Sequence, residues 1–342
     1  MGQQIKKSFF SAKTVLLTFF ALMFCLNVSG QDIWAEEETK ALSSISQEVL
    51  MKDIIFLSDS ICQGRATGSQ GNIEASKMIA RRFEESGLTK MGEVWESEFH
   101  VRRGIKGKNI IGILPGSYTL PCDRYIIIGA HYDHIGTLGG KIYPGADANA
   151  SGVAALTALA QMFGAMRKMG KIFSYNLIFV AFDAKEHDFL GSNSLWNMIE
   201  YGRLKDPVTG ESITKDKIDL MVNIDQIGCT LSPIKKERKD YLIMLGTPSL
   251  PKAQRGLLNK CNKESGTDLD IALDYYGSAN FTKVFYRLSD QRVFVDNKIP
   301  AVLFTSGITM NTNKVWDSPE TINQEVLLKR TKLIYHWLSE IL

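Results

Sequence analysis

The chain has 342 residues, of which 44% are apolar and 23% are charged, an ordinary balance for a globular protein with a sizeable core. Its formal charge of +3 comes from 40 Lys and Arg against 37 Asp and Glu, and three of the lysines lie in the first 30 residues. Without that segment, 37 basic residues balance 37 acidic ones. This balance excludes the strong positive charge of nucleic-acid-binding proteins. The four cysteines beyond the segment contain no CxxC pair, which excludes a zinc knuckle.

The amino-terminal segment has the pattern of an export signal. Its lysines precede an apolar run over residues 14–30 that ends in small side chains. We therefore predict a signal peptide over residues 1–30, cleaved between Gly30 and Gln31, and an exported (periplasmic or secreted) mature protein. The run is short for an uncleaved membrane anchor, so we expect no stable membrane insertion after cleavage. Residues 31–342 are expected to form a single domain.

The first part of the mature chain predicts two helices and a strand. Residues 41–58 have the apolar spacing of a helix. The Gly-rich segment "GRATGSQGN" leads into a second helix, which is predicted over residues 73–87. The segment "KNIIGIL" is typical of a strand, which Pro115 and Gly116 end.

Four later apolar runs are rich in Ile and Val and predict strands, at residues 125–130, 176–182, 219–225 and 301–307. Helical segments at 150–168 and 191–202 separate the earlier runs, which favours a largely parallel, buried sheet in an α/β fold. The last helix is predicted over residues 319–341, with Pro319 in its first turn.

Polar residues of metal-ligand type follow three of these strands. His131 and Asp133 come after the first, Glu186 after the second, and Asp225 at the end of the third. Ligands of α/β sheets gather just beyond the carboxyl ends of strands. We therefore expect these side chains to share one site.

A fourth acidic residue, Asp147, lies in "PGADANASG" just before a predicted helix. Its other interpretation is an ordinary helix N-cap. If Asp147 joins His131, Glu186 and Asp225, one imidazole and three carboxylates form a set that suits Zn²⁺ or a similar divalent ion. Asp133, two residues beyond His131, is close enough to orient its imidazole.

These motifs resemble the zinc-dependent aminopeptidases of metallopeptidase family twenty-eight, which also contains the glutaminyl cyclases. The resemblance spans about residues 56–325 and rests on the segments "LSDSICQGRATGSQGN", "GAHYDHIG", "GADANASG", "FVAFDAKEHDFLGS", "NIDQIG", "SDQRVF" and "IPAVLFTSG". It implies an α/β, three-layer zinc-exopeptidase-like fold, in which a mixed, mostly parallel sheet is flanked by helices.

The resemblance also implies a two-metal site. Asp147 would bridge both ions, and His131 and Asp225 would complete the first. Glu186 and a later His would complete the second, while a Glu just before Glu186 would be the general base. Asp133 would support His131.

Two positions depart from this pattern. The general-base position holds Lys185, whose ammonium group cannot accept a proton unless its pKa is strongly lowered. The final His is replaced by Asn313, which is at most a weak ligand. We therefore expect one strong zinc site, with the second site weak or replaced by Lys185.

Three functions follow as hypotheses. The first is a secreted zinc aminopeptidase that removes amino-terminal residues from peptides, with reduced efficiency. Its proton acceptor would be one of four groups: Asp188, His187, a metal-free Glu186, or Lys185 with a depressed pKa. The second is a catalytically weak or inactive peptide-binding pseudo-peptidase, because loss of a general base typically costs about two to four orders of magnitude in rate. The third is a glutaminyl-cyclase-like acyltransferase.

Substrate contacts are predicted at two positions. Asp290 lies in "RLSDQRVF", where the resemblance places a substrate-side loop, and Tyr132 follows His131 directly. Peptides are the expected partners, and no nucleic acid is expected.

Overall fold

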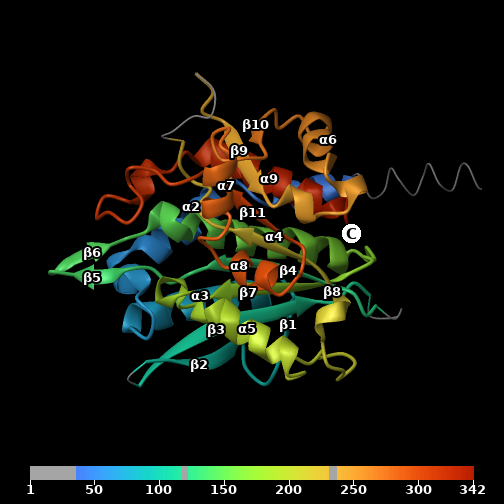
Figure 1. Cartoon of the computed structure of the whole chain (residues 1–342), viewed down its shortest axis with the longest axis horizontal. Coiled ribbons are helices and arrows are strands. Elements are labelled where there is room, and N and C mark those ends of the chain that lie inside the picture. Colours follow the sequence, from blue (N-terminus) through green and yellow to red (C-terminus); the bar gives the residue numbers. More distant parts are fainter. Residues whose placement is uncertain (1–35, 103, 118–121, 231–236) are drawn as a thin grey trace, which may run out of the picture.

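The computed structural model describes residues 36–102, 104–117, 122–230 and 237–342 (Figure 1). The predicted signal peptide, residues 1–30, lies outside these ranges. Within them, no helix is both long and apolar enough to cross a membrane.

A nine-stranded mixed sheet forms the centre of the described fold. Its order is β1-β3-β7-β4-β8-β11-β9-β10, and β2 pairs with β3 outside this path. The strands are β1 (Thr89–Lys90), β2 (Glu96–Arg102), β3 (Ile105–Leu114), β4 (Tyr125–His131), β7 (Asn176–Phe182), β8 (Ile218–Ile224), β9 (Tyr241–Leu245), β10 (Asp270–Ala272) and β11 (Ala301–Thr305).

The four central strands, β7, β4, β8 and β11, run parallel to one another. His131 pairs in register with Phe182, and Gly129 pairs with Asn223. This register brings the carboxyl ends of β4, β7 and β8 to one edge of the sheet. The predicted parallel sheet is therefore confirmed, and the loops that follow these strands meet at that edge.

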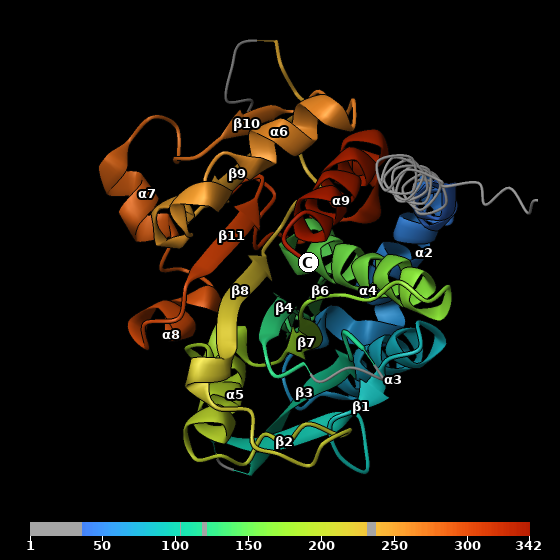
Figure 2. The ribbon, with the colours of Figure 1, turned by 90° about the vertical axis from the view of Figure 1, so that its right-hand side faces the viewer.

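Helices cover both faces of the sheet (Figures 1 and 2). Alternating strand residues feed two cores: on β4, Ile126 and Ile128 pack on one side, while Ile127 packs on the other. The first core is covered by α2 (Gln47–Ser58), α3 (Gln70–Glu85), α4 (Gly152–Lys168) and α9 (Gln324–Ser339), and the second by α5 (Leu190–Glu200) and α8 (Gln291–Asp296).

Helix boundaries follow local capping chemistry. The helix predicted over 41–58 is divided: residues 36–43 are helical, and α2 begins separately at Gln47, where the Ser46 side chain accepts a hydrogen bond from the Val49 N–H. The last helix differs from its prediction, because Pro319–Thr321 forms a separate 3₁₀ turn. Helix α9 starts after Asn323, whose side chain accepts from the Val326 N–H at 3.1 Å.

The buried guanidinium of Arg65 ties the Gly-rich loop to the strand ends. It donates from Nε to the Tyr132 carbonyl (2.7 Å), from Nη1 to Pro144 (2.7 Å) and from Nη2 to Gly145 (2.9 Å). Burial lowers the pKa of Arg65 to about 10, so it remains charged at neutral pH. The loop before α4 is thereby fixed against the end of β4.

Two short antiparallel strands, β5 (Gly136–Leu138) and β6 (Lys141–Tyr143), form a hairpin between β4 and this loop. The hairpin projects from one end of the molecule in Figure 1. Two small helices, α6 (Leu257–Glu264) and α7 (Ala279–Phe285), belong to the part of the chain around β9 and β10.

Candidate functional site

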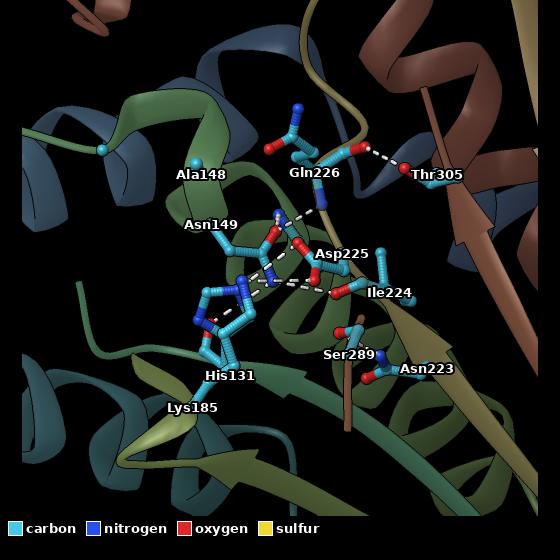
Figure 3. A network of polar contacts seen from close by, with 12 residues as sticks. His131, Ala148, Asn149, Lys185, Asn223, Ile224, Asp225, Gln226, Ser289 and Thr305 are labelled. Atoms are coloured by element: carbon cyan, nitrogen blue, oxygen red, sulfur yellow. Dashed lines mark hydrogen bonds and ion pairs between the residues drawn. The ribbon is translucent and has the colours of Figure 1, made fainter. Parts of the chain in front are cut away.

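Three strand ends contribute charged side chains to one cluster (Figure 3). His131 ends β4, Lys185 follows β7, and Asp225 follows β8. The His131 Nε2 atom lies 3.3 Å from Asp225 Oδ1. The sequence-based expectation that these strand ends share a site agrees with this arrangement.

Asp133 positions the loop after β7 more directly than it positions His131. Its carboxylate accepts the backbone N–H groups of Lys185 at 3.0 Å and Glu186 at 3.1 Å. His131 Nδ1 instead donates to the Asp133 backbone carbonyl at 3.1 Å, and lies 3.6 Å from the carboxylate. Asp133 is therefore a link between the two strand ends.

The loop after β7 turns sharply at non-glycine residues. Ala184, Asp188 and Phe189 have φ values of 58°, 57° and 60°, in the left-handed region. Such conformations are costly for residues other than glycine and persist where surrounding contacts hold them. Here they enclose the 3₁₀ turn Lys185–His187.

The Lys185 ammonium group lies between two carboxylates. Its Nζ atom is 3.5 Å from Glu186 Oε1 and 3.7 Å from Asp225 Oδ2. Burial alone would lower the pKa of Lys185, but Asp225 and Glu186 outweigh it and hold the pKa well above its usual range. This direction opposes the hypothesis of a Lys185 general base, which needs a depressed pKa.

The same ion pairs govern Asp225 and His131. Burial would raise the pKa of Asp225, but Lys185 and His131 hold it well below its usual range. Burial and Lys185 would lower the pKa of His131, but Asp225 and Asp133 outweigh them and raise it to about 10. These contacts therefore favour the protonated imidazole.

The Asp147 side chain does not lie where the resemblance to the family implies. Its buried carboxylate accepts hydrogen bonds from the Gly228 N–H at 2.7 Å and from Ser151 Oγ at 3.1 Å, and it does not line the pocket beside Lys185. The residue that lines the pocket is its neighbour Ala148. The Asp317 carboxylate holds this loop by accepting both backbone N–H groups, at 2.9 and 3.1 Å.

A cavity of about 220 Å³ opens beside Lys185 and Asp225. Its walls come from strand ends and from the loops around α7, and it includes Asn313. The lining residues are Ala148, Lys185, Asp225, Gln226, Tyr275, Phe285, Leu288, Ser289, Leu303, Thr305, Gly307, Ile308, Thr312 and Asn313.

Neither predicted substrate contact lines this pocket. Tyr132 is fully buried, and its hydroxyl donates to the Lys108 carbonyl at 2.8 Å. Asp290 is also fully buried and accepts a hydrogen bond from Ser192 at 2.7 Å. Burial raises the pKa of Asp290 to about 6. Both side chains are therefore buried in the structure and do not line the pocket.

The three remaining candidates for proton acceptor do not line the pocket. Asp188 is 90% exposed and lies 3.9 Å from Arg292, and both His187 and Glu186 are absent from the pocket lining. The residues that sequence reasoning missed are Ala148, Gln226 and the apolar wall. An alanine or a scattered set of apolar residues carries no chemical signal, so nothing in the sequence singled them out.

The side chains present do not fit a zinc ion. Asp147 does not line the pocket, and Ala148, which does, offers no ligand atom. Across the described ranges, no three or more His, Cys, Asp or Glu side chains are grouped so as to hold a metal. The expected trio of His131, Asp147 and Asp225 is therefore not assembled.

The layered sheet with its site at the carboxyl edge is of the zinc-exopeptidase class. A family model described as Peptidase family M28 matches residues 109–338. The chain therefore belongs to peptidase family M28, which confirms the resemblance seen in the sequence.

Solved structures share this fold. The LapA aminopeptidase of Legionella pneumophila is 17% identical, with 90% of this chain and 75% of that chain covered and a TM-score of 0.66. The aminopeptidase of Aneurinibacillus sp. strain AM-1 is 14% identical, with 89% of this chain and 95% of that chain covered and a TM-score of 0.63. Porphyromonas gingivalis glutaminyl cyclase is 15% identical, with 87% of this chain and 99% of that chain covered and a TM-score of 0.63.

The Lys185 ion pairs predict a pH-dependent loss of stability in Lys185→Met. The lowered pKa of Asp225 stabilises the fold above about pH 4, and the raised pKa of Lys185 does so below about pH 10. Within that window the variant should lose about 3 kcal/mol of unfolding free energy, because a buried carboxylate is left unpaired. The deficit should shrink as the pH falls below about 4.

Urea unfolding followed by circular dichroism at pH 7 and pH 3 measures this difference. Lys185→Arg keeps the charge and is the matched control, with a smaller loss expected. Equal losses in both variants, or a loss that does not depend on pH, would contradict the ion-pair account.

Proposed function

We propose that this member of the peptidase family binds peptides in the pocket beside Lys185 and does not hydrolyse them by a metal-dependent route. The observation that carries the proposal is the Lys185 ammonium group between Glu186 and Asp225, at 3.5 and 3.7 Å. A cation of one charge occupies the place where the family implies a metal ion.

The chemistry of hydrolysis lacks its main parts in this arrangement. A metal would supply a Lewis acid for the scissile carbonyl and an activated water. Lys185 stays protonated and therefore accepts no proton from water, and Ala148 supplies no ligand. Loss of a general base alone typically lowers the rate by about two to four orders of magnitude.

The pocket supports binding of a single apolar residue. Its volume of about 220 Å³ is below the range of about 300–1,000 Å³ typical of sites for drug-sized ligands. Leu288, Leu303 and Ile308 are among the apolar residues that line it. One side chain of a peptide, rather than a large cofactor, is the natural occupant.

A zinc aminopeptidase is the second candidate. Its support is the presence of His131, Glu186 and Asp225 in one cluster, and the aminopeptidases among the structures with this fold. This candidate requires that zinc displaces Lys185 and deprotonates His131. It predicts tight metal uptake by the purified protein.

Hydrolysis of leucine p-nitroanilide with added zinc separates the two candidates. Our proposal predicts that the mature wild-type protein is no faster than its Lys185→Met variant, and that it binds the peptide Leu-Leu-Leu, in its free or its acetylated form, in calorimetry. It also predicts that Ala148→Asp combined with Lys185→Glu raises zinc affinity at least about tenfold, because both changes place carboxylates at the pocket.

Lys52→Met, on the exposed side of α2, is the matched control and should equal wild type in every assay. Zinc-dependent hydrolysis by wild type that exceeds the Lys185→Met rate would establish the aminopeptidase instead. Absence of both hydrolysis and peptide binding would remove the proposal.

We further propose export through the signal segment, on the basis of its lysines followed by the apolar run over residues 14–30. Expression of the full chain in an exporting host should give a mature protein that begins at Gln31. Intact-mass spectrometry of the released fraction measures this. A chain that keeps residues 1–30 and sediments with membranes would show an uncleaved anchor.

A further inference from the structure

The pocket offers hydrogen-bond donors to a ligand, and the charged ones belong to Lys185. Lys185 carries three N–H donors, and its side chain lines the cavity and is 21% exposed. Its ion-pair contacts, at 3.5 and 3.7 Å, exceed the usual N–H···O distance of about 2.7–3.2 Å. The carboxylates therefore hold the ammonium electrostatically, without satisfying its donors in ordinary geometry.

Asp225 and Gln226, the polar groups nearest Lys185 in the chain order of the lining, are engaged with other residues. Asp225 contacts His131 through Oδ1 and Lys185 through Oδ2. Gln226 donates from Nε2 to the Gly307 carbonyl and to Thr312 Oγ1 at 3.0 Å. A hydrogen-bond acceptor of a ligand can therefore bind to one charged donor in the pocket, the Lys185 ammonium group.

Charged residues of both signs lie close together at the pocket, so a ligand with a positive or a negative charge is repelled by one of them. A free peptide amine that approached Asp225 would come close to the Lys185 ammonium group, which lies 3.7 Å from the Asp225 Oδ2 atom. A carboxylate that approached Lys185 would come close to the anions Asp225 and Glu186. At about 4 Å and an effective dielectric of about 20, such like-charge contacts are strong enough to decide binding.

We propose that the pocket selects an uncharged acyl group: a neutral amide carbonyl that accepts from Lys185, joined to an apolar side chain that packs against Leu288, Leu303 and Ile308. Peptides whose amino end is acylated have this chemistry, and free amino ends do not. The inference rests on the proposed peptide-binding function and names the chemical class that this site takes.

Three leucine derivatives of nearly the same shape test the selection by isothermal titration calorimetry on the mature protein at pH 7. N-acetyl-leucinamide has no charge, leucinamide carries an ammonium group, and N-acetyl-leucine carries a carboxylate. The expected result is that N-acetyl-leucinamide binds at least about tenfold more tightly than either ion, since each ion meets a like charge.

Lys185→Met should reverse the preference. It removes the donor and releases Asp225 and Glu186, so that N-acetyl-leucinamide loses at least about tenfold in affinity while leucinamide gains. Lys52→Met should leave all three affinities unchanged. The wild-type ranking needs no variant, so an unfolded Lys185→Met protein does not remove the test.

The failures of this inference and of the proposed function are distinct. If leucinamide or N-acetyl-leucine binds as tightly as the neutral compound, the selection is overturned while peptide binding stands. If acetylated and free Leu-Leu-Leu also fail to bind, the peptide-binding function falls with it.

Discussion

The contact between the Lys185 ammonium group and the Asp225 carboxylate is the interaction on which the site depends. It joins the loop after β7 to the end of β8, across the strand β4 that lies between them. Asp133, beyond β4, completes the link by accepting the backbone N–H groups of Lys185 and Glu186. The strained backbone at Ala184 is held by these contacts.

This pairing sets the protonation of its neighbours. Lys185 and Asp225 favour each other's charged form, and Asp225 favours the protonated form of His131. An ammonium group neither accepts a proton nor acts as a Lewis acid. In our account the site therefore keeps the family's position at the sheet edge but changes from activation of water to presentation of a hydrogen-bond donor.

The sequence predicted the framework of the site because strand ends carry strong signals. Long Ile- and Val-rich runs define β4, β7 and β8, and parallel strands align their carboxyl ends. His131 and Asp225 were therefore found in the right place. The loop before α4 was not predictable in the same way, because a choice between Asp147 and Ala148 depends on backbone angles within one turn.

Other differences between the predictions and the structure also arise from local backbone geometry and from tertiary packing. Tyr132 follows His131 directly, but its side chain enters the core, where Lys108 accepts from its hydroxyl. The start of α9 was displaced because an Asn323 cap and a separate 3₁₀ turn compete with the Pro319 signal. The pocket wall from α7 and β11 consists of apolar residues far apart in the chain, which only tertiary packing brings together.

The most direct measurement is anomalous X-ray diffraction at the zinc absorption edge, on crystals of the mature protein grown with zinc. The account predicts that Lys185 Nζ occupies the space between Glu186 and Asp225 and that no anomalous peak lies there. A peak at about 2.0–2.2 Å from oxygens of both carboxylates, with the Lys185 side chain displaced, would contradict it.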